Sequence, residues 1–124
     1  MDDITVISIA DIEPYQGPHA IPGIRFRAAR QALGVTAWGM NLLELDGECT
    51  GYPEHDHTGD GQEEVYLVLD GSVVLQAGGQ ERVLERGDLA RVAPGVRRKL
   101  VTRASGATIL AIGATPGQAF TPTM

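Results

Sequence analysis

The sequence has little cysteine, little positive charge and no long apolar run, and each shortage excludes a class of protein. Cys49 is the single cysteine among 124 residues, so no internal disulfide can form and a reducing, cytoplasmic location is expected. The net charge of -6 and the pI near 4.9 disfavour binding to nucleic acids or anionic membranes. No apolar run approaches the ~20 residues of a membrane helix, and the acidic start Met1-Asp2-Asp3 lacks the positive charge of a signal peptide.

Helical periodicity and internal repeats are also missing, since no stretch has the pattern of an amphipathic helix of ten or more residues. Sixteen glycines are instead spread between short apolar runs, which is typical of short strands joined by turns. A second compact core would leave each half below about 70 residues, where a core alone seldom suffices. We therefore expect one all-β domain over residues 1–124, a closed antiparallel barrel or jelly roll of some eight or more strands.

Proline and glycine divide the chain into an N-terminal arm (1–23), a barrel (24–113) and an irregular tail (114–124). In the arm, residues 4–9 alternate weakly and are a possible first strand, and His19 is either a surface histidine or a further metal ligand if the arm folds over the barrel. Asp70-Gly71 is predicted to be a hairpin turn. The other strands are expected at residues 24–30, 35–45, 64–69, 72–76, 82–84, 89–93, 99–102 and 108–112.

The sequence H-D-H-T-G-D-G-Q-E-E-V-Y-L-V-L-D-G, residues 55–71, concentrates the residues that could hold a metal ion. His55 and His57 are two positions apart, so in an extended strand both imidazoles point to the same face. After a glycine-containing loop, the next strand returns Glu63 or Glu64 beside them. Two imidazoles and one carboxylate form a three-ligand site for a divalent transition metal such as Fe, Mn, Ni or Zn, with positions open for water or substrate.

Strand register assigns further candidates for a binding site. If Glu64 points inward, Tyr66 shares its face and is a candidate acid or hydrogen-bond partner of a substrate. Gln62 lies at the mouth of the site. Trp38 and Met40, in the apolar run of residues 35–45, either line a pocket or belong to the core.

These motifs resemble the cupin superfamily over residues 38–113. The order H-x-H, loop, Glu64, six residues, Gly71 is similar to the first cupin motif, although the loop is two or three residues longer than the common form. Residues 87–99, G-D-L-A-R-V-A-P-G-V-R-R-K, are similar to the second motif, but Arg98 replaces the histidine that is usually the fourth ligand. The resemblance implies a small single-domain cupin barrel that forms a homodimer.

Arg98 is the main departure from the cupin pattern. A guanidinium stays protonated and has no lone pair for a cation, so Arg98 cannot replace the missing ligand. We expect it to point inward with Leu100 and Thr102. It would either clamp the carboxylate or phosphate of a metal-bound substrate, or swing out and pair with an acidic side chain. In a relic cupin site without metal, Arg98 would instead pair with Glu64 itself.

These observations lead to two hypotheses of function. The first is a metal-dependent enzyme, of oxygenase, isomerase, lyase or cyclase type, that acts on a small polar or anionic metabolite. The second is a non-catalytic module that binds or senses a small molecule in the barrel, with or without metal, and uses Arg98 as its anion contact.

Overall fold

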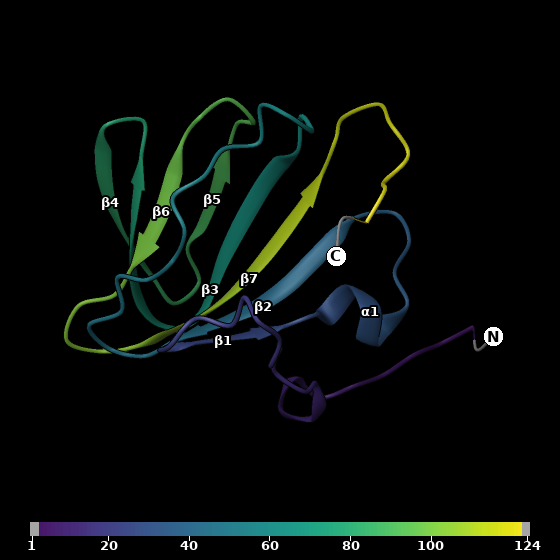
Figure 1. Cartoon of the computed structure of the whole chain (residues 1–124), viewed down its shortest axis with the longest axis horizontal. Coiled ribbons are helices and arrows are strands. Elements are labelled where there is room, and N and C mark those ends of the chain that lie inside the picture. The colour runs from purple at the N-terminus through teal and green to yellow at the C-terminus, as the bar shows by residue number, and fades with distance from the viewer. Residues whose placement is uncertain (1–2, 123–124) are drawn as a thin grey trace.

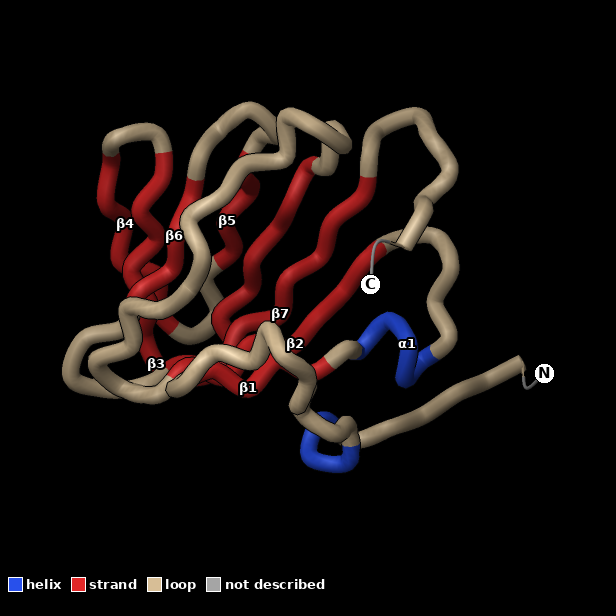
Figure 2. The backbone as a smooth tube through the Cα atoms, viewed as in Figure 1, coloured by secondary structure: helices blue, strands red, loops and turns tan. Residues whose placement is uncertain are grey.

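The computed structural model of the protein describes residues 3–122, and seven strands dominate it (Figure 1; Figure 2). The two helices are a 3-10 turn, η1 (Ile9–Asp11), and one short α-helix, α1 (Ala29–Leu33). The strands are β1 (Ile24–Arg27), β2 (Gly39–Leu45), β3 (Glu63–Ala77), β4 (Gln80–Glu85), β5 (Leu89–Val92), β6 (Arg98–Val101) and β7 (Ala107–Ala114). Every strand pair is antiparallel, and the predicted all-β jelly-roll class is confirmed. Within residues 3–122, no helix is long and apolar enough to cross a membrane.

Strand β3 connects the two layers of the jelly roll. Its first half lies between β5 and β7, and its second half lies between β4 and β6. The prediction of a hairpin turn at Asp70-Gly71 was therefore wrong, because the register shifts there while the strand continues. Gly71 has a φ of 74°, and a Cβ at this position would collide with the carbonyl oxygen of Gly106, so the crossing chain requires a glycine.

The described strands do not close into a barrel. The strands follow the order β1-β2-β7-β3-β4, with β5 and β6 paired to β3 off this path, and the edge strands β1 and β4 do not pair with each other in the part of the chain described. The expectation of a closed barrel is thus corrected. Part of the N-terminal arm covers β1 instead, through a bridge between Pro14 and Arg27 and a hydrogen bond from the Tyr15 N–H to the Phe26 carbonyl.

Three other predicted elements differ from the structure. Residues 4–8 are not a strand, and residues 29–33 form α1 where a strand was expected to continue. The helix ends at Gly34, whose φ of 79° lets its N–H donate to the carbonyls of Arg30 and Gln31. Because the chain changes direction at Gly34, β2 begins at Gly39 and not at residue 35 as predicted. The outermost residues of the predicted arm and tail, 1–2 and 123–124, lie outside the described residues.

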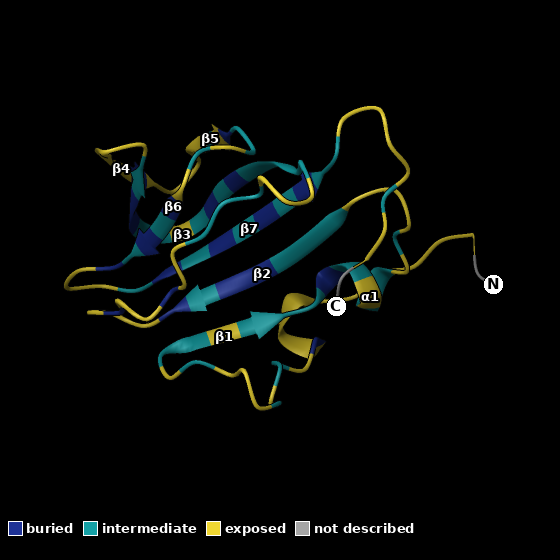
Figure 3. Ribbon diagram, turned by 45° about the horizontal axis from the view of Figure 1, so that its top comes forward, coloured by how far each residue is buried: buried dark blue, intermediate teal, exposed yellow. Residues whose placement is uncertain are grey.

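The main core lies between the two layers and follows the alternation of the strands (Figure 3). Its completely buried members include Tyr66, Val68, Leu100 and Ile109. A smaller cluster, Ile12, Ala29 and Leu42, covers the other face of β2 beneath α1 and the arm. Strand β2 is therefore buried on both sides, as its continuous apolar run predicted.

Candidate metal centre

The loop between β2 and β3 carries His55 and His57, and it is held against the β6 end of the sheet. His55 and Arg98 exchange two backbone hydrogen bonds of 3.0 and 2.8 Å, and the His57 N–H donates to the Pro94 carbonyl at 2.8 Å. The segment forms an isolated bridge and not the predicted full strand. It is nevertheless extended enough to place both imidazoles together, with ring centroids 5.0 Å apart.

Glu64, the second residue of β3, supplies the carboxylate. Its Oε1 lies 3.2 Å from Nε2 of His57 and 3.8 Å from Nε2 of His55, and the three side chains can offer ligand atoms within 4.8 Å of one another. Glu63 points the other way and pairs with Arg91. Of the two carboxylates that the sequence left open, the structure therefore brings Glu64 to the histidines.

Hydrogen bonds at Nδ1 decide which nitrogen of each imidazole faces the centre. Nδ1 of His55 is 2.9 Å from the Pro53 carbonyl oxygen, which can only accept, so Nδ1 carries the hydrogen. Nδ1 of His57 is 3.0 Å from the Asp60 carboxylate, which favours the same tautomer. In neutral rings both Nε2 atoms then direct lone pairs toward Glu64. The buried Nε2 of His57 makes no hydrogen bond despite its proximity to Glu64 Oε1, and a cation between these atoms would satisfy both.

The charges around Glu64 favour its ionised form. Burial alone would raise the pKa of this carboxyl, but the neighbouring imidazoles of His55 and His57, the hydroxyl of Tyr66 and the guanidinium of Arg98 together hold it below its usual range. Glu64 in turn raises the pKa of His55 against the opposing effect of burial. A carboxylate and two imidazoles are thus prepared to share one positive charge, either a metal ion or a proton.

Two tyrosines extend from Glu64 toward the cavity. Tyr66 is completely buried and donates to Glu64 Oε1 at 2.9 Å, and burial raises the pKa of its hydroxyl, so it remains protonated. The Tyr52 hydroxyl lies 3.4 Å from that of Tyr66, and burial raises its pKa to about 12. Tyr52 lines the cavity beside the histidines, whereas Tyr66 does not. Sequence reasoning missed Tyr52, although it lies only three residues before His55.

Arg98 lies behind Glu64 and has no exposed surface. Its Nη1 is 3.5 Å from Glu64 Oε1, and its Nη2 donates to the Ala93 carbonyl at 2.9 Å, while Nε and Nη1 make no hydrogen bond. Arg98 does not line the cavity in front of the histidines. Its position matches the expected alternative of pairing with Glu64, and its inward direction was predicted from register, whereas the expected outward swing is wrong because Arg98 is completely buried.

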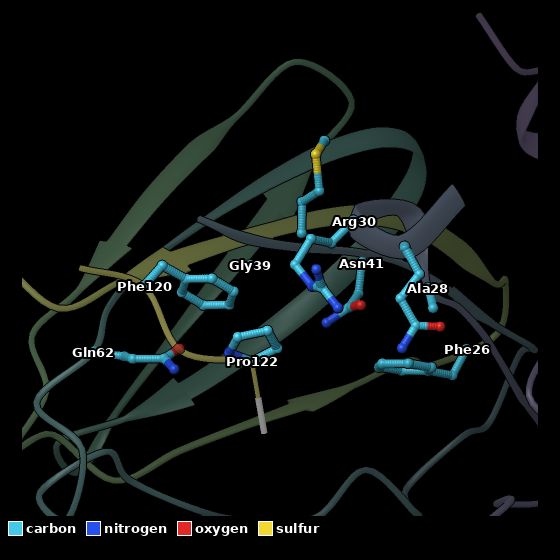
Figure 4. A pocket seen from close by; sticks show the side chains of 10 residues that line it. Phe26, Ala28, Arg30, Gly39, Asn41, Gln62, Phe120 and Pro122 are labelled. Atoms are coloured by element: carbon cyan, nitrogen blue, oxygen red, sulfur yellow. The ribbon is translucent and has the colours of Figure 1, made fainter. Parts of the chain in front are cut away.

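The histidines and Glu64 open into a cavity of about 390 Å³. The predicted mouth residue Gln62 lines it, and so does His19 from the arm, although His19 does not belong to the metal-binding cluster. Met40 lines a smaller adjoining pocket with Arg30 and Phe120 (Figure 4). Trp38 is 42% exposed and lines neither space.

Comparisons with known proteins agree on one family and one fold. The model of the cupin domain family matches residues 42–112, more than half of the chain. A cupin protein from Bacteroides fragilis has a TM-score of 0.74 at 22% identity, covering 100% of this chain and 94% of the other. A sugar phosphate isomerase of the cupin superfamily from Silicibacter pomeroyi has a TM-score of 0.75 at 22% identity, covering 95% and 77%. A predicted oxalate decarboxylase from Thermotoga maritima has a TM-score of 0.73 at 18% identity, covering 90% and 99%. No curated protein matches the sequence.

Proposed function

This chain belongs to the cupin domain family, and from that premise we propose that it is a metal-dependent enzyme acting on a small polar or anionic metabolite. His55, His57 and Glu64 would hold one divalent transition metal ion, such as Fe, Mn, Ni or Zn. One observation carries the proposal: both histidines donate Nδ1–H elsewhere, so that both Nε2 lone pairs converge on a carboxylate oxygen. Without a cation these atoms repel one another.

Each residue around the site has a role that its contacts support. Pro53 and Asp60 fix the tautomers of the two histidines, and Tyr66 orients Glu64. Tyr52 keeps its proton and lines the cavity, where it can contact a bound substrate. A divalent ion would supply Lewis-acid polarisation and free coordination positions, because the chain provides three ligands instead of four.

Oxygenase, isomerase, lyase and cyclase chemistry all fit this arrangement. The names of the Silicibacter pomeroyi and Thermotoga maritima proteins describe an isomerase and a predicted decarboxylase. At 22% and 18% identity, these similarities support the fold and not a reaction. The reaction type of this chain is therefore to be found by assay.

Elemental analysis followed by a turnover screen tests the proposal. We expect protein purified without chelators to contain close to one transition metal ion per chain. The metal-loaded protein should convert a member of a panel of small carboxylic acids, dicarbonyls and catechols, and the Glu64→Ala variant should convert none. Folded protein that contains no transition metal and takes none up would contradict the proposal.

A second candidate function is a non-catalytic module that binds or senses a small molecule. The contact between Arg98 and Glu64 favours it, because a guanidinium at 3.5 Å and a proton on His55 can balance the carboxylate without metal. Saturable binding of a metabolite by metal-free protein, with no turnover after metal loading, would support this module over the enzyme.

We also propose that the protein is a cytoplasmic homodimer. Exposed apolar side chains support an association surface: Val83 on β4 is 55% exposed and Leu89 on β5 is 68% exposed. The single, unpaired thiol of Cys49 is compatible with a reducing compartment. Sedimentation that shows only monomer at micromolar concentration would contradict the dimer.

A further inference from the structure

Among residues 3–122, no lysine or arginine lines the cavity in front of the candidate metal centre. Its acidic groups are Glu64, which faces both histidines, and the exposed Asp60, which pairs with His57; its remaining polar groups are neutral or histidine side chains. The nearby arginines are directed elsewhere. Arg25 and Arg27, on either side of Phe26 in β1, both pair with Glu44.

Arg98 and Arg30 also lie near this space, and neither lines it. Arg98 is enclosed behind Glu64. Arg30 lies in the adjoining pocket, where its Nη1 donates to the Val35 carbonyl at 3.2 Å and its guanidinium lies 5.9 Å from the ring centroid of Phe120 (Figure 4). Phe26, Asn41 and Gln62 line both spaces and therefore stand between Arg30 and the main cavity.

The wall that faces the main cavity is largely apolar. Ile24 and Phe26 come from β1, Leu43 from β2, and Ile21 from the arm. Asn41 and Gln62 add neutral amide groups, which can donate or accept hydrogen bonds but cannot neutralise an anion. A second anionic group directed at this wall would lose its hydration without gaining a cation as partner.

The charge next to the metal centre limits the charge of the ligand. A bound divalent ion would add two positive charges to the one on Arg98, and Glu64 and Asp60 bring two negative charges, so one positive charge would remain. One anionic oxygen donor balances it. A ligand with two or more negative charges would leave an uncompensated anion in a cavity that contains no other partner for it.

We propose that the substrate is neutral or carries a single negative charge on its metal-binding oxygens, and that its other end is an apolar or aromatic body seated against Phe26 and Leu43. This inference rests on the proposed function, since the oxygens bind the metal. It narrows the substrate class away from dicarboxylates and phosphate-bearing sugars. The volume of about 390 Å³ is large enough for such a body, because ligand cavities span about 300–1,000 Å³.

A matched pair of probes tests the charge preference. Zinc-loaded protein is titrated calorimetrically with 4-methylcatechol and with 3,4-dihydroxybenzoate, which share the metal-binding head and differ in a methyl or carboxylate group. Each affinity is divided by the affinity of the same probe for free Zn²⁺. We expect 4-methylcatechol to bind at least tenfold more tightly on this scale. If 3,4-dihydroxybenzoate binds as tightly as 4-methylcatechol on this scale, or more tightly, the proposal is overturned.

Variants identify the wall as the origin of the preference. Ile21→Lys adds a cation to the wall and should narrow the ratio between the two probes or reverse it. Arg30→Gln, in the adjoining pocket, is the matched control and should leave the ratio unchanged. A carboxylate probe whose binding depends on Arg30 would show that the anionic end reaches the adjoining pocket, contrary to the proposal.

A metal-free measurement separates failure of this inference from failure of the proposed function. Benzyl alcohol and benzoate are added in turn to apo protein at pH 8, and the side-chain amide signals of Asn41 and Gln62 are followed by NMR. We expect the shifts to saturate with both ligands, and the concentration for half-saturation to be at least tenfold lower for benzyl alcohol than for benzoate. If the protein binds no metal, the enzyme hypothesis fails, but the ratio of the two ligand affinities still tests the charge preference of the cavity. Stronger binding of benzoate than of benzyl alcohol would overturn the inference.

Discussion

Arg98 and Glu64 form a buried pair, with Nη1 of the guanidinium 3.5 Å from Oε1 of the carboxylate and no exposed surface on Arg98. The same carboxylate oxygen faces Nε2 of both histidines, at 3.2 Å from His57 and 3.8 Å from His55. Arg98 therefore affects any ion held by Glu64, although it does not line the cavity itself. A permanent positive charge at this distance stabilises the carboxylate and repels a second cation.

We predict that Arg98→His binds divalent metal about tenfold or more tightly than the parent, since the change removes a repelling charge and adds a possible ligand. Competition titration with a metal-binding dye measures the difference. Arg97→His is the matched control, because Arg97 is exposed and pairs with Glu54 away from the site. Equal affinities for the parent and the Arg98 variant would show that Arg98 does not weaken metal binding.

The double variant His55→Ala, His57→Ala should lose transition-metal binding and keep its fold. The core between the layers consists of apolar strand residues, so folding does not depend on the ion. Elemental analysis and circular dichroism measure the two properties. His19→Ala is the control, because His19 lines the cavity outside the metal-binding cluster. An unfolded double variant would indicate a structural role of the site instead.

Tyr66→Phe should weaken metal binding about 10- to 100-fold, because it removes the hydroxyl that orients Glu64. Loss of this charge-assisted hydrogen bond should also lower the unfolding free energy by about 1.5–3 kcal/mol. Tyr52→Phe leaves the hydrogen bond from the Tyr66 hydroxyl to Glu64 in place, so it should affect ligand binding more than metal binding. Metal titration and urea unfolding of both variants distinguish these roles. Identical metal affinities of the Tyr66→Phe and Tyr52→Phe variants would contradict the role of Tyr66 in orienting Glu64.

Glu44 should stabilise the fold at neutral pH, and this contribution should be lost in acid. Burial acts to raise the pKa of this carboxyl, but hydrogen bonds from Arg27 and Arg25 outweigh it and hold the pKa below its ordinary 4.5. Because the folded-state pKa is the lower one, this stabilisation is complete above pH 4.5 and is lost as the pH falls through the folded value.

Urea unfolding between pH 7 and pH 3 checks the contribution of Glu44. Glu44→Gln should lower stability by about 1–2 kcal/mol at pH 7 and by less at pH 3. Glu81→Gln is the control, because its pair with Arg103 is more exposed and should contribute little. A Glu44→Gln difference that does not shrink in acid would rule out this source of pH dependence.

Gly71→Ala should destabilise the protein much more than Gly79→Ala. Both glycines have positive φ, 74° and 77°, so both variants carry a backbone strain of about 1 kcal/mol. A Cβ at residue 79 meets open space, whereas one at residue 71 collides with the Gly106 carbonyl and forces apart the chains that cross there. We expect a difference of about 3 kcal/mol or complete misfolding. Thermal unfolding measures it, and equal melting temperatures would disprove the steric explanation.

Local patterns in the sequence were sufficient for much of the site. Period-two alternation placed Tyr66 and Val68 on the same face as Glu64, and it directed Arg98 inward with Leu100, as the structure confirms. The spacing of His55 and His57 likewise brought both rings to one side. These features depend only on neighbours along an extended chain, so a short stretch of sequence determines them.

Other features depend on partners far away in the sequence. Asp70-Gly71 has the composition of a hairpin turn, but Gly106 and the strands on both sides of β3 hold it in a continuous bent strand. Residues 35–38 have the apolar pattern of a strand, but the preceding helix and its end at Gly34 take them out of the sheet. Local propensity cannot resolve such cases, because long-range pairing selects between conformations of similar energy.

The sequence by itself determined an antiparallel jelly roll with two histidines and a glutamate on one inner face, because strand alternation and turn composition are local properties. Only the tertiary structure decided what surrounds those ligands. Residues 34 positions apart had to meet before Arg98 could lie behind Glu64. The arm and the first two strands had to pack before the cavity could acquire its largely apolar wall of Ile21, Ile24, Phe26 and Leu43. Charge balance and shape at the site arise from such long-range contacts, which no local pattern encodes.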